Sequence, residues 1–577
     1  MIQLFRNLRL AAGMAKSHLT DDPLTLLLQV SRRLPATFVQ PIASTFAEFA
    51  PRTSAALPSL LADLISGDDA GVQRRLKLAL DGQLDVGGAK RLADVAIAAQ
   101  LPTEAEVFIQ RAAGAKGLEQ VQARRLWHEG EASNAVEALA GTGRAGTAQR
   151  ERLLGELRVL TGATPTLGRR EFVPLQGRVL HLLTNSLPHT TSGYAQRSHS
   201  ILAAQRDAGW EVLAVTRIGY PVHVGKLAAG AVDVVDGIRY QRLLPGPLAQ
   251  TLDARLQQQT EELLKVVLDF RPAVLHTTTH YVNALVVRAV ARAVGIPWVY
   301  EVRGQLADTW ASSRGASAKR SERYRLFQER EAEVMNDADL VVTLGREMKS
   351  NIVAAGVPES KVLISPNAVG GDYLNEPLDV VSARRVLGLA EGGHYIGTVS
   401  SLVAYEGIDC LIEAFNILAP RFPELRLLIV GDGASRPALE LQARNSHHAD
   451  RIIFTGRVPR GEAVTYHQAL DVFAVPRRDL EVTRSVTPLK PVEALASARP
   501  VVASNLPALQ EIVTDGVSGT LVPADDAGQL ADAVEVLLRD GPLRNSLGRN
   551  GRSQVLESRT WPATARALSA AYRELQE

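Results

Sequence analysis

The chain has 577 residues, of which 46% are apolar and 22% are charged. At about 150 residues per domain, this length predicts two to three domains with large buried cores and excludes a single small module. The 64 basic and 62 acidic residues give a formal net charge of +2 without a long run of one sign, so nucleic acid is not an expected partner.

The first segment of the chain, residues 1–165, has the composition of a helical domain. It is rich in Ala, Leu, Arg and Glu, and its apolar residues recur at helical spacing. The pattern is loosely similar to tetratricopeptide pairs, although no clean period of roughly 34 residues occurs. We expect this all-α domain to bind a protein partner or a membrane-linked acceptor, or to self-associate. The alternative is a helical appendage with no part in catalysis.

The N-terminal stretch is basic and apolar, but it does not have the pattern of a membrane span or signal peptide. No segment approaches roughly 18 uninterrupted apolar residues, and Arg6 and Arg9 interrupt the apolar run. We interpret this N-terminal stretch as the first amphipathic helix of a domain. An interfacial helix with Arg6, Arg9 and Lys16 on its polar side is the alternative. With Cys410 as the single cysteine, no intramolecular disulfide can form, and we expect a cytoplasmic protein with peripheral contact at the inner membrane face as an option.

After residue 160 the composition and the apolar pattern of the sequence change. Gly, Thr and Pro cluster in residues 161–175, which is typical of a linker. Short Val- and Leu-rich runs then alternate with helical patterns, first over residues 172–375 and again over residues 376–560. This predicts an α/β protein with two Rossmann-like domains facing a cleft, in which ligands bind beyond the carboxyl ends of the strands. Residues 561–577 are expected to form a helix that crosses back to the first of these domains.

The most informative stretch is residues 476–504, where a polar loop runs into a helix and then a short apolar strand. Thr487 is a good N-cap and Pro488 suits the first helical position, so the sequence predicts a helix start with free backbone N–H groups for a phosphate. Lys490 and Glu493 are three residues apart and share one face, where they would supply a cation for a diphosphate and a carboxylate for ribose hydroxyls. The alternative is an ordinary amphipathic helix with a solvated Lys–Glu pair.

Several motifs in order resemble one enzyme family. EALASARPVVAS, which begins at Glu493, resembles the donor-binding signature of family 4 glycosyltransferases, which are retaining enzymes of the GT-B fold, and VTPLKP resembles one branch of that family. The resemblance covers the chain from about Gly177 onward. The other matching motifs are NSLPHTTSGYAQRSHSI (185–201), TRIGYP (216–221), LHTTTHYVNAL (275–285), VYEVRG (299–304), ISPNAV (364–369), GTVSSLVAYEGIDCLIEAF (397–415), LLIVGDG (427–433) and FTGRVP (454–459).

The chain departs from the family pattern at three positions. Ser485 occupies the position of the first signature glutamate. Ser401 and Glu406 stand where most of the family has an Arg and a Lys that grip the leaving diphosphate. The resemblance therefore implies that other cations neutralise the phosphates, and Lys490, Arg477 and Arg303 are the candidates.

The resemblance implies a set of site residues. His276 and His280 follow a strand that points into the cleft, with a structural, hydrogen-bonded role as the alternative, and Glu301 and Arg303 either form an ion pair or reach the acceptor. No metal is expected, because helix N–H groups and cations can neutralise a diphosphate, and Asp337 and Asp339 are interpreted as a helix end and strand start. The expected catalytic residues are Lys490, Arg477 and His280; the donor-binding residues are Glu493, Thr487, Val486, Ser485, Gly193, Tyr194, Ser401, Arg457 and Val458; the acceptor-side residues are His276, Glu301 and Arg303.

The expected function is that of a retaining hexosyltransferase. A sugar would pass from a UDP- or GDP-sugar, without cofactor, to a glycan or lipid-linked acceptor of a bacterial exopolysaccharide, capsule or cell-wall glycan. A helical-repeat adaptor that carries a degenerate, non-catalytic transferase module is the alternative, favoured by Ser485, Ser401 and Glu406 and opposed by the intact glycine loop and VTPLK block. An epimerase or a phosphorylase on the same fold is a third hypothesis.

Overall fold

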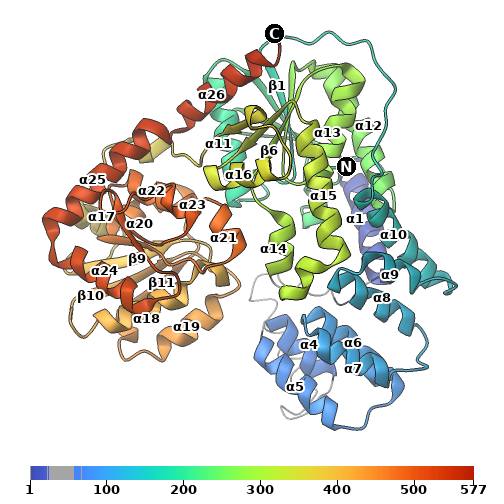
Figure 1. Ribbon diagram of the computed structural model, residues 1–577, viewed down its shortest axis with the longest axis horizontal. Helices are drawn as coiled ribbons and strands as arrows, with labels where there is room; N and C mark the ends of the chain where they lie inside the picture. Colours follow the sequence, from blue (N-terminus) through green and yellow to red (C-terminus); the bar gives the residue numbers. More distant parts are fainter. Residues whose placement is uncertain (1, 22–23, 25–56, 67, 313) are drawn as a thin grey trace.

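The computed structural model describes residues 2–21, 24, 57–66, 68–312 and 314–577. The described chain forms a helical region followed by two domains that are each built on a mainly parallel sheet (Figure 1). The part of the predicted helical domain over residues 25–56 lies outside the described residues, as does the side chain of Lys16.

The helical region is held together by small apolar cores between successive helices. Asp68 and Asp85 cap two of these helices by accepting hydrogen bonds from backbone N–H groups. Leu60, Leu76 and Phe108 are fully buried in its largest core. The helices are α1 (Ile2–Asp21), α4 (Leu57–Ser66), α5 (Asp69–Asp81), α6 (Val86–Ala98), α7 (Pro102–Arg111), α8 (Leu118–Glu129), α9 (Ala132–Glu137) and α10 (Arg144–Leu160).

Helix α1 packs on the first sheet domain instead of standing apart. Asn7 donates two hydrogen bonds of 2.8 Å to the carbonyl oxygens of Leu227 and Ala229, and Leu10 is buried on the same face. Arg6 lies on the exposed side. Within the described ranges, no helix is long and apolar enough to cross a membrane.

The first sheet domain has eight strands in the order β3-β4-β2-β1-β5-β6-β7-β8, all parallel except β3, which pairs antiparallel with β4. Val- and Leu-rich strands are buried on both faces because helices cover both sides. The strands are β1 (Arg178–Leu183), β2 (Glu211–Thr216), β3 (Val232–Val235), β4 (Ile238–Arg242), β5 (Val274–Thr278), β6 (Trp298–Val302), β7 (Leu340–Thr343) and β8 (Val362–Ile364). The helices are α11 (Gly193–Asp207), η1 (Val222–Val224), α12 (Leu252–Phe270), α13 (Tyr281–Val294), α14 (Leu306–Ser312), η2 (Ala316–Arg320), α15 (Glu322–Asp337), α16 (Arg346–Ala354) and η3 (Glu359–Lys361).

The second sheet domain has six parallel strands in the order β11-β10-β9-β12-β13-β14. Its strands are β9 (His394–Val399), β10 (Leu425–Val430), β11 (Ile452–Gly456), β12 (Val472–Val475), β13 (Val501–Ser504) and β14 (Gly519–Val522). Its helices are η4 (Gly371–Leu374), α17 (Val380–Val386), η5 (Ala404–Glu406), α18 (Ile408–Leu418), α19 (Arg436–Arg444), η6 (Ala449–Arg451), α20 (Arg460–Ala469), α21 (Glu481–Ser485), α22 (Lys490–Ala496), α23 (Pro507–Gln510), α24 (Ala527–Arg539) and α25 (Gly541–Ser558).

The chain crosses between the two sheet domains twice, and the two crossings are bonded to each other. Val369 on the outward crossing donates to the carbonyl of Arg559 and accepts from the N–H of Trp561 on the return crossing, at 2.9 and 3.0 Å. Helix α26 (Trp561–Glu574) then packs over the first sheet, where Leu568 and Tyr572 are fully buried (Figure 1). The last helix therefore belongs to the core of the first sheet domain.

Candidate active site

A cavity of about 750 Å³ lies between the two sheet domains. Residues of α11, including Gln196 and Ser200, line one side, and residues of α20 and α22, including Arg460 and Glu493, line the other. Arg460 bridges the two sides by donating to Gln196 and, at 3.3 Å, to Ser200. The predicted ribose ligand thus faces a space that both domains enclose.

The helix that carries Glu493 starts later than the sequence predicts. Helix α22 begins at Lys490 with Leu489 at the N-cap position, so the assignment of Thr487 as N-cap and Pro488 as the first helical residue is wrong. The reason is tertiary: Thr487 is buried, and its carbonyl accepts a 2.8 Å hydrogen bond from Asn367 of the interdomain crossing. This contact holds the backbone of Thr487 outside the helix.

The backbone at Val486 is also less available than predicted. Its N–H donates to the carbonyl of Val482 at 3.1 Å, because a short helix that the sequence analysis missed, α21, precedes it. Thr487 Oγ1, in contrast, is buried and has no hydrogen-bond partner among the described residues. The polar group left at this point for a ligand is therefore on Thr487 and not on Val486.

Lys490 and Glu493 lie side by side, as their spacing predicts. Lys490 Nζ is 3.0 Å from Glu493 Oε2, and the side chains are 37% and 13% exposed. His467 approaches the same carboxylate from α20, with its Nε2 4.0 Å away. Burial lowers the pKa of His467 to about 4, so this imidazole is neutral at pH 7 and Lys490 is the cation next to Glu493.

Arg477, predicted as a second cation for the diphosphate, is paired with Glu406. Its Nη2 and Nε lie 2.7 and 3.1 Å from the two oxygens of Glu406, and its Nη1 donates to the carbonyl of Val486 at 3.0 Å. Gly407 permits this approach, because it has φ +66° and a Cβ there would collide with the carbonyl of Pro476. Arg477 is therefore a neutralised, buried group that positions Val486.

Ser485 also makes a contact that the sequence does not reveal. Its Oγ lies 3.1 Å from Gln305 Oε1, across the boundary between the two sheet domains, and 2.7 Å from the carbonyl oxygen of Glu481. Lys319 of η2 adds a 3.3 Å ion pair to Glu481. The segment between β6 and α15 thus touches α21 of the second sheet domain directly.

The remaining predicted donor residues lie at the edges of the second sheet and at the start of α11. Ser401 follows β9 and Arg457 follows β11, and both are exposed, while Val458 is half-buried against the second domain's core. Gly193 begins α11, and a Cβ there would meet no atom within 4 Å. Tyr194 is exposed, and its hydroxyl lies close to Gly304 at the end of β6, where an added Cβ would be 3.2 Å away.

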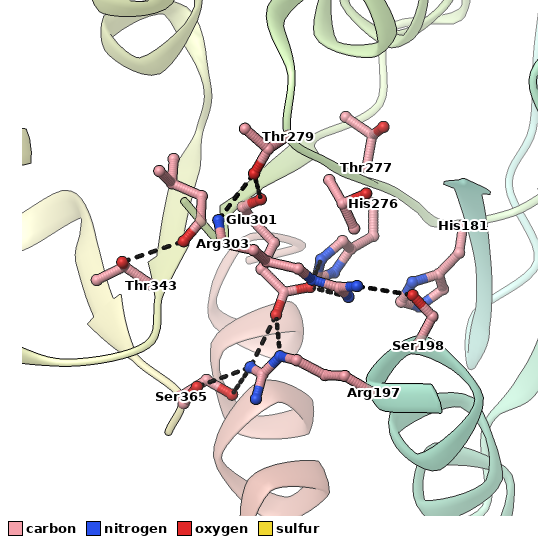
Figure 2. A network of polar contacts seen from close by, with 12 residues as sticks. His181, Arg197, Ser198, His276, Thr277, Thr279, Glu301, Arg303, Thr343 and Ser365 are labelled. Carbon is pink, nitrogen blue, oxygen red and sulfur yellow. Dashed lines mark hydrogen bonds and ion pairs between the residues drawn. The ribbon is translucent and has the colours of Figure 1, made fainter. Parts of the chain in front are cut away.

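Figure 2 shows that the predicted acceptor-side residues form a buried ion-pair network. Glu301 pairs with Arg197 of α11 at 2.8 Å and with Arg303 at 2.5 Å, and each of these three side chains is at most 3% exposed. The two guanidinium groups hold the pKa of Glu301 well below its usual range, although burial alone would raise it. The prediction that Glu301 and Arg303 reach an acceptor is wrong, and the ion-pair alternative holds.

His276 belongs to the same network and cannot contact a sugar. It is fully buried, stacks on His181 with ring centroids 4.4 Å apart, and lies 3.4 Å from Glu301. Its Nδ1 is bonded to the hydroxyl of Tyr572 on α26. Burial lowers the pKa of His276, and the neutral ring is held in place as a structural residue.

The network is hydrogen-bonded to the segment in which the chain first crosses between the two sheet domains. Arg197 donates to the carbonyl oxygens of Ser365 and Pro366 at 2.7 and 2.9 Å, and to Asn367 Oδ1 at 3.2 Å. Asn367 in turn bonds the carbonyl of Thr487. Sequence reasoning missed Arg197 and Asn367, although both lie inside quoted motifs. Only their burial reveals that they link the first sheet to the residues before α22.

His280 differs from His276 because it lies at the carboxyl edge of the first sheet. It is half-buried before α13, and its Nδ1 is buried without a hydrogen-bond partner in the described part of the chain. Burial, followed by the charges of Arg217 and Arg323, lowers the pKa of His280 to about 4. A neutral imidazole at this position can exchange a hydrogen bond with a hydroxyl group, so His280 stays a candidate.

Asp337 and Asp339, the two carboxylates that resemble a metal-binding pair, each bind another residue of the protein. Asp337 pairs with Arg292 at 2.5 Å, and Asp339 accepts the N–H of Trp298 at 2.8 Å. Over the described ranges, no group of three His, Cys, Asp or Glu side chains has the geometry of a metal site.

Comparisons with known proteins assign both sheet domains. A family model described as a glycosyl transferase 4-like domain matches residues 192–368, and one described as glycosyl transferases group 1 matches residues 381–554. The chain is 32% identical over 229 residues, 39% of its length, to the GDP-mannose-dependent alpha-(1-6)-phosphatidylinositol monomannoside mannosyltransferase of Mycolicibacterium smegmatis, and spans 60% of that relative. It is 28% identical to the D-inositol 3-phosphate glycosyltransferase of Corynebacterium diphtheriae over 362 residues, 59% of this chain and 81% of the relative.

The fold agrees with a solved structure. Sucrose-phosphate synthase from Thermosynechococcus elongatus superposes with a TM-score of 0.57 at 22% identity, over 69% of this chain and 99% of that structure. This likeness confirms the predicted fold class of two Rossmann-like domains that face a cleft.

Proposed function

We propose that this chain, which belongs to the family 4 glycosyltransferases, moves a hexose from a nucleotide-diphosphate donor to a glycan or lipid-linked acceptor with retention of configuration. The observation that carries the proposal is that Glu493, with Lys490 beside it, faces the cavity enclosed by both sheet domains. We expect the chain to act in the synthesis of a bacterial exopolysaccharide, capsule or cell-wall glycan at the inner face of the membrane. The donor is a UDP- or GDP-sugar, and the name of one relative, which is GDP-mannose-dependent, supports this class.

The ion pairs at Lys490 and Arg477 suggest how a donor would be held. Lys490 and Arg477 are each paired with a carboxylate, so these two pairs carry little net charge. Lys490 bonds Oε2 of Glu493, and a carboxylate has further acceptor sites for the hydroxyls of a ribose. With a donor bound, Glu493 would accept from the ribose, and Lys490, which is partly exposed, would turn from Glu493 to the diphosphate.

The chemistry is then mainly electrostatic. The anomeric carbon bonds to an acceptor hydroxyl oxygen while its bond to the diphosphate oxygen breaks, and the hydroxyl proton passes to that departing oxygen on the same face of the sugar. Lys490 and nearby backbone N–H groups stabilise the charge that develops on the diphosphate. One such donor typically contributes about 2.7–4 kcal/mol to the barrier.

Contacts between the sheet domains help to exclude water from this reaction. Arg460 reaches α11 across the cavity, and Gln305 meets Ser485 at another point of the boundary between the two domains. A closed arrangement of this kind strengthens the electrostatic contacts inside and limits hydrolysis of the donor.

A non-catalytic adaptor is the second candidate. The pairing of Arg477 with Glu406 favours it, because a cation that is already neutralised contributes less to phosphate binding. An adaptor has no requirement to bind a nucleotide, whereas the transferase must.

The test is calorimetric titration of the chain with UDP and with GDP, followed by incubation of a radiolabelled sugar donor with and without acceptor. We expect one of the two nucleotides to bind and label to pass to the acceptor. Absence of binding by both nucleotides would contradict the transferase proposal and support the adaptor. Conversion of the labelled donor to another nucleotide sugar, without acceptor, would indicate an epimerase instead, and transfer to inorganic phosphate would indicate a phosphorylase.

A further inference from the structure

Arg323 is held between two tryptophan rings at the junction of the helical region and the first sheet domain. Its Cζ lies 5.1 Å from the ring centroid of Trp127 on α8 and 5.6 Å from that of Trp310 on α14. All three side chains are half-buried, so solvent still reaches them. Rings that cover the guanidinium fix its orientation and leave the N–H groups at its edge available for hydrogen bonds.

Arg323 has no anionic partner among the described residues. No carboxylate of the described chain lies within 4.0 Å of its guanidinium, and its side chain donates no described hydrogen bond. Other arginines of the same helix behave differently, since Arg325 pairs with Glu329 at 2.8 Å and Arg330 pairs with Glu333. A half-buried arginine that is stacked but not paired has unused capacity for an anion.

The surroundings of Arg323 are positively charged. Arg314 stacks on the same Trp310 ring at 4.8 Å. Burial and the charge of Arg323 both lower the pKa of Arg314. His128, beside Trp127, has a pKa of about 4, lowered by burial and then by Arg314 and Arg323. An anion placed here would offset the positive charges of Arg314 and Arg323.

Helix α15 connects this cluster to His280 at the carboxyl edge of the first sheet. Arg323, Phe327 and Glu331 recur every four residues and share one face of the helix. Glu331 accepts the N–H of Tyr281 at 2.8 Å, and the ring of Phe327 lies 6.1 Å from that of His280. Arg323 therefore lies one helical turn from Phe327, which packs against His280. Among the residues that the structure describes, Nδ1 of His280 has no hydrogen-bond partner.

Hydrogen bonds and close packing fix the helical region to the first sheet domain next to Arg323. Ser133 at the start of α9 donates from its N–H and its hydroxyl to Glu322, at 2.7 and 2.5 Å, and the N–H of Arg323 donates to the carbonyl of Gly130 at 2.9 Å. Gly130 packs so closely on Ser321 and Trp310 that a Cβ would collide with both. Trp127 is thus held against Arg323 by the turn that follows α8.

We propose that Arg323, with Arg314, Trp127 and Trp310 around it, binds a phosphate group carried by the acceptor, a role that rests on the proposed transferase function. The fork of N–H donors on a guanidinium matches two oxygens of a phosphate, and the two rings keep that fork in one orientation. The phosphate belongs either to a free phosphate ester or to a lipid headgroup. The helical region accordingly takes part in acceptor binding through Trp127.

The experiment measures phosphate binding separately from nucleotide binding. The full chain is titrated calorimetrically with glycerol 3-phosphate, and in parallel it is sedimented with phosphatidylcholine vesicles with and without phosphatidic acid. The variants are Arg323→Gln, Arg323→Lys and Trp127→Phe, with Arg325→Gln as a matched control on the same helix. UDP and GDP titrations of every variant report whether the donor site and the fold are intact.

We expect Arg323→Gln to weaken phosphate binding about tenfold or more, as loss of a charge-assisted hydrogen bond does, and Arg323→Lys to restore part of it. Arg325→Gln and all nucleotide affinities stay unchanged. An effect on glycerol 3-phosphate identifies a free ester as the source, and an effect on phosphatidic acid vesicles alone identifies a lipid headgroup; both support the proposal. Equal loss in the Arg323→Gln and Arg325→Gln variants, or binding of neither probe by a chain that binds a nucleotide, overturns it. Phosphate binding without nucleotide binding would instead refute only the proposed function.

Discussion

Replacing Glu493 by alanine removes the one carboxylate of α22 that lines the interdomain cavity. A hydrogen bond to a charged group contributes about 1.5–3 kcal/mol. Against this stands the contact with Lys490, which the donor must break and which contributes at most about 1 kcal/mol because Lys490 is 37% exposed. The net loss of about 1.5 kcal/mol corresponds to roughly a tenfold weaker affinity for the nucleotide, and turnover falls by a similar factor or more.

Stability changes little in this variant, because Lys490 is left at a partly solvated position and no buried charge is created. The assay is calorimetric titration with the nucleotide that the parent chain binds, together with thermal unfolding and turnover. The matched control is Glu262→Ala, which removes the acidic partner of Lys265 in an equivalent pair three residues apart on α12, at 2.7 Å. Unchanged nucleotide affinity in Glu493→Ala would refute the assignment, as would an equal loss in the control.

Further predictions concern the neighbouring charges. Lys490→Ala should lower turnover more than nucleotide affinity, because its charge matters most as the diphosphate departs; if Arg477→Ala alone shows that pattern in steady-state kinetics, the cation is Arg477. Glu406→Gln should destabilise the fold by about 1–3 kcal/mol in urea unfolding, since it leaves the buried Arg477 without its anion; unchanged stability would mean that the pair is dispensable. His467 has a folded pKa of about 4 against 6.5 unfolded, so the unfolded chain binds the extra proton and stability falls as pH drops. His467→Gln should abolish about 2 kcal/mol of the stability lost between pH 7 and pH 5, and an unaltered pH profile would exclude this residue as the cause.

Much of the architecture could be predicted because it depends on local pattern. Runs such as LVVT, now β7, are apolar throughout because both faces of a parallel strand are covered, and the second such set after residue 375 indicated a second sheet. The spacing of Lys490 and Glu493 likewise fixes their proximity through helix geometry alone. Catalytic and donor-binding roles for the individual residues stay predictions.

The missed helix α21 is a local error, and the other errors came from contacts between distant parts of the chain. Thr487 has a good N-cap side chain, but the hydrogen bond from Asn367, 120 residues away in sequence, holds its backbone outside the helix. Glu301 and Arg303 end a strand that points to the cleft, yet Arg197, 104 residues earlier than Glu301, draws the carboxylate into the interior. Local sequence shows the residue types of such pairs and not which of them will meet.

The placement of α26 has a consequence for the order in which the protein can mature. Its side chains Trp561, Leu568 and Tyr572 complete the apolar interior of the domain that begins at β1, and Trp210 donates a 2.9 Å hydrogen bond to Ser569 on the same helix. During synthesis, these residues leave the ribosome only after the whole second sheet domain has been made. The apolar surface of the first sheet domain that α26 covers therefore stays exposed until α26 has been translated. Folding of this domain can be completed only then.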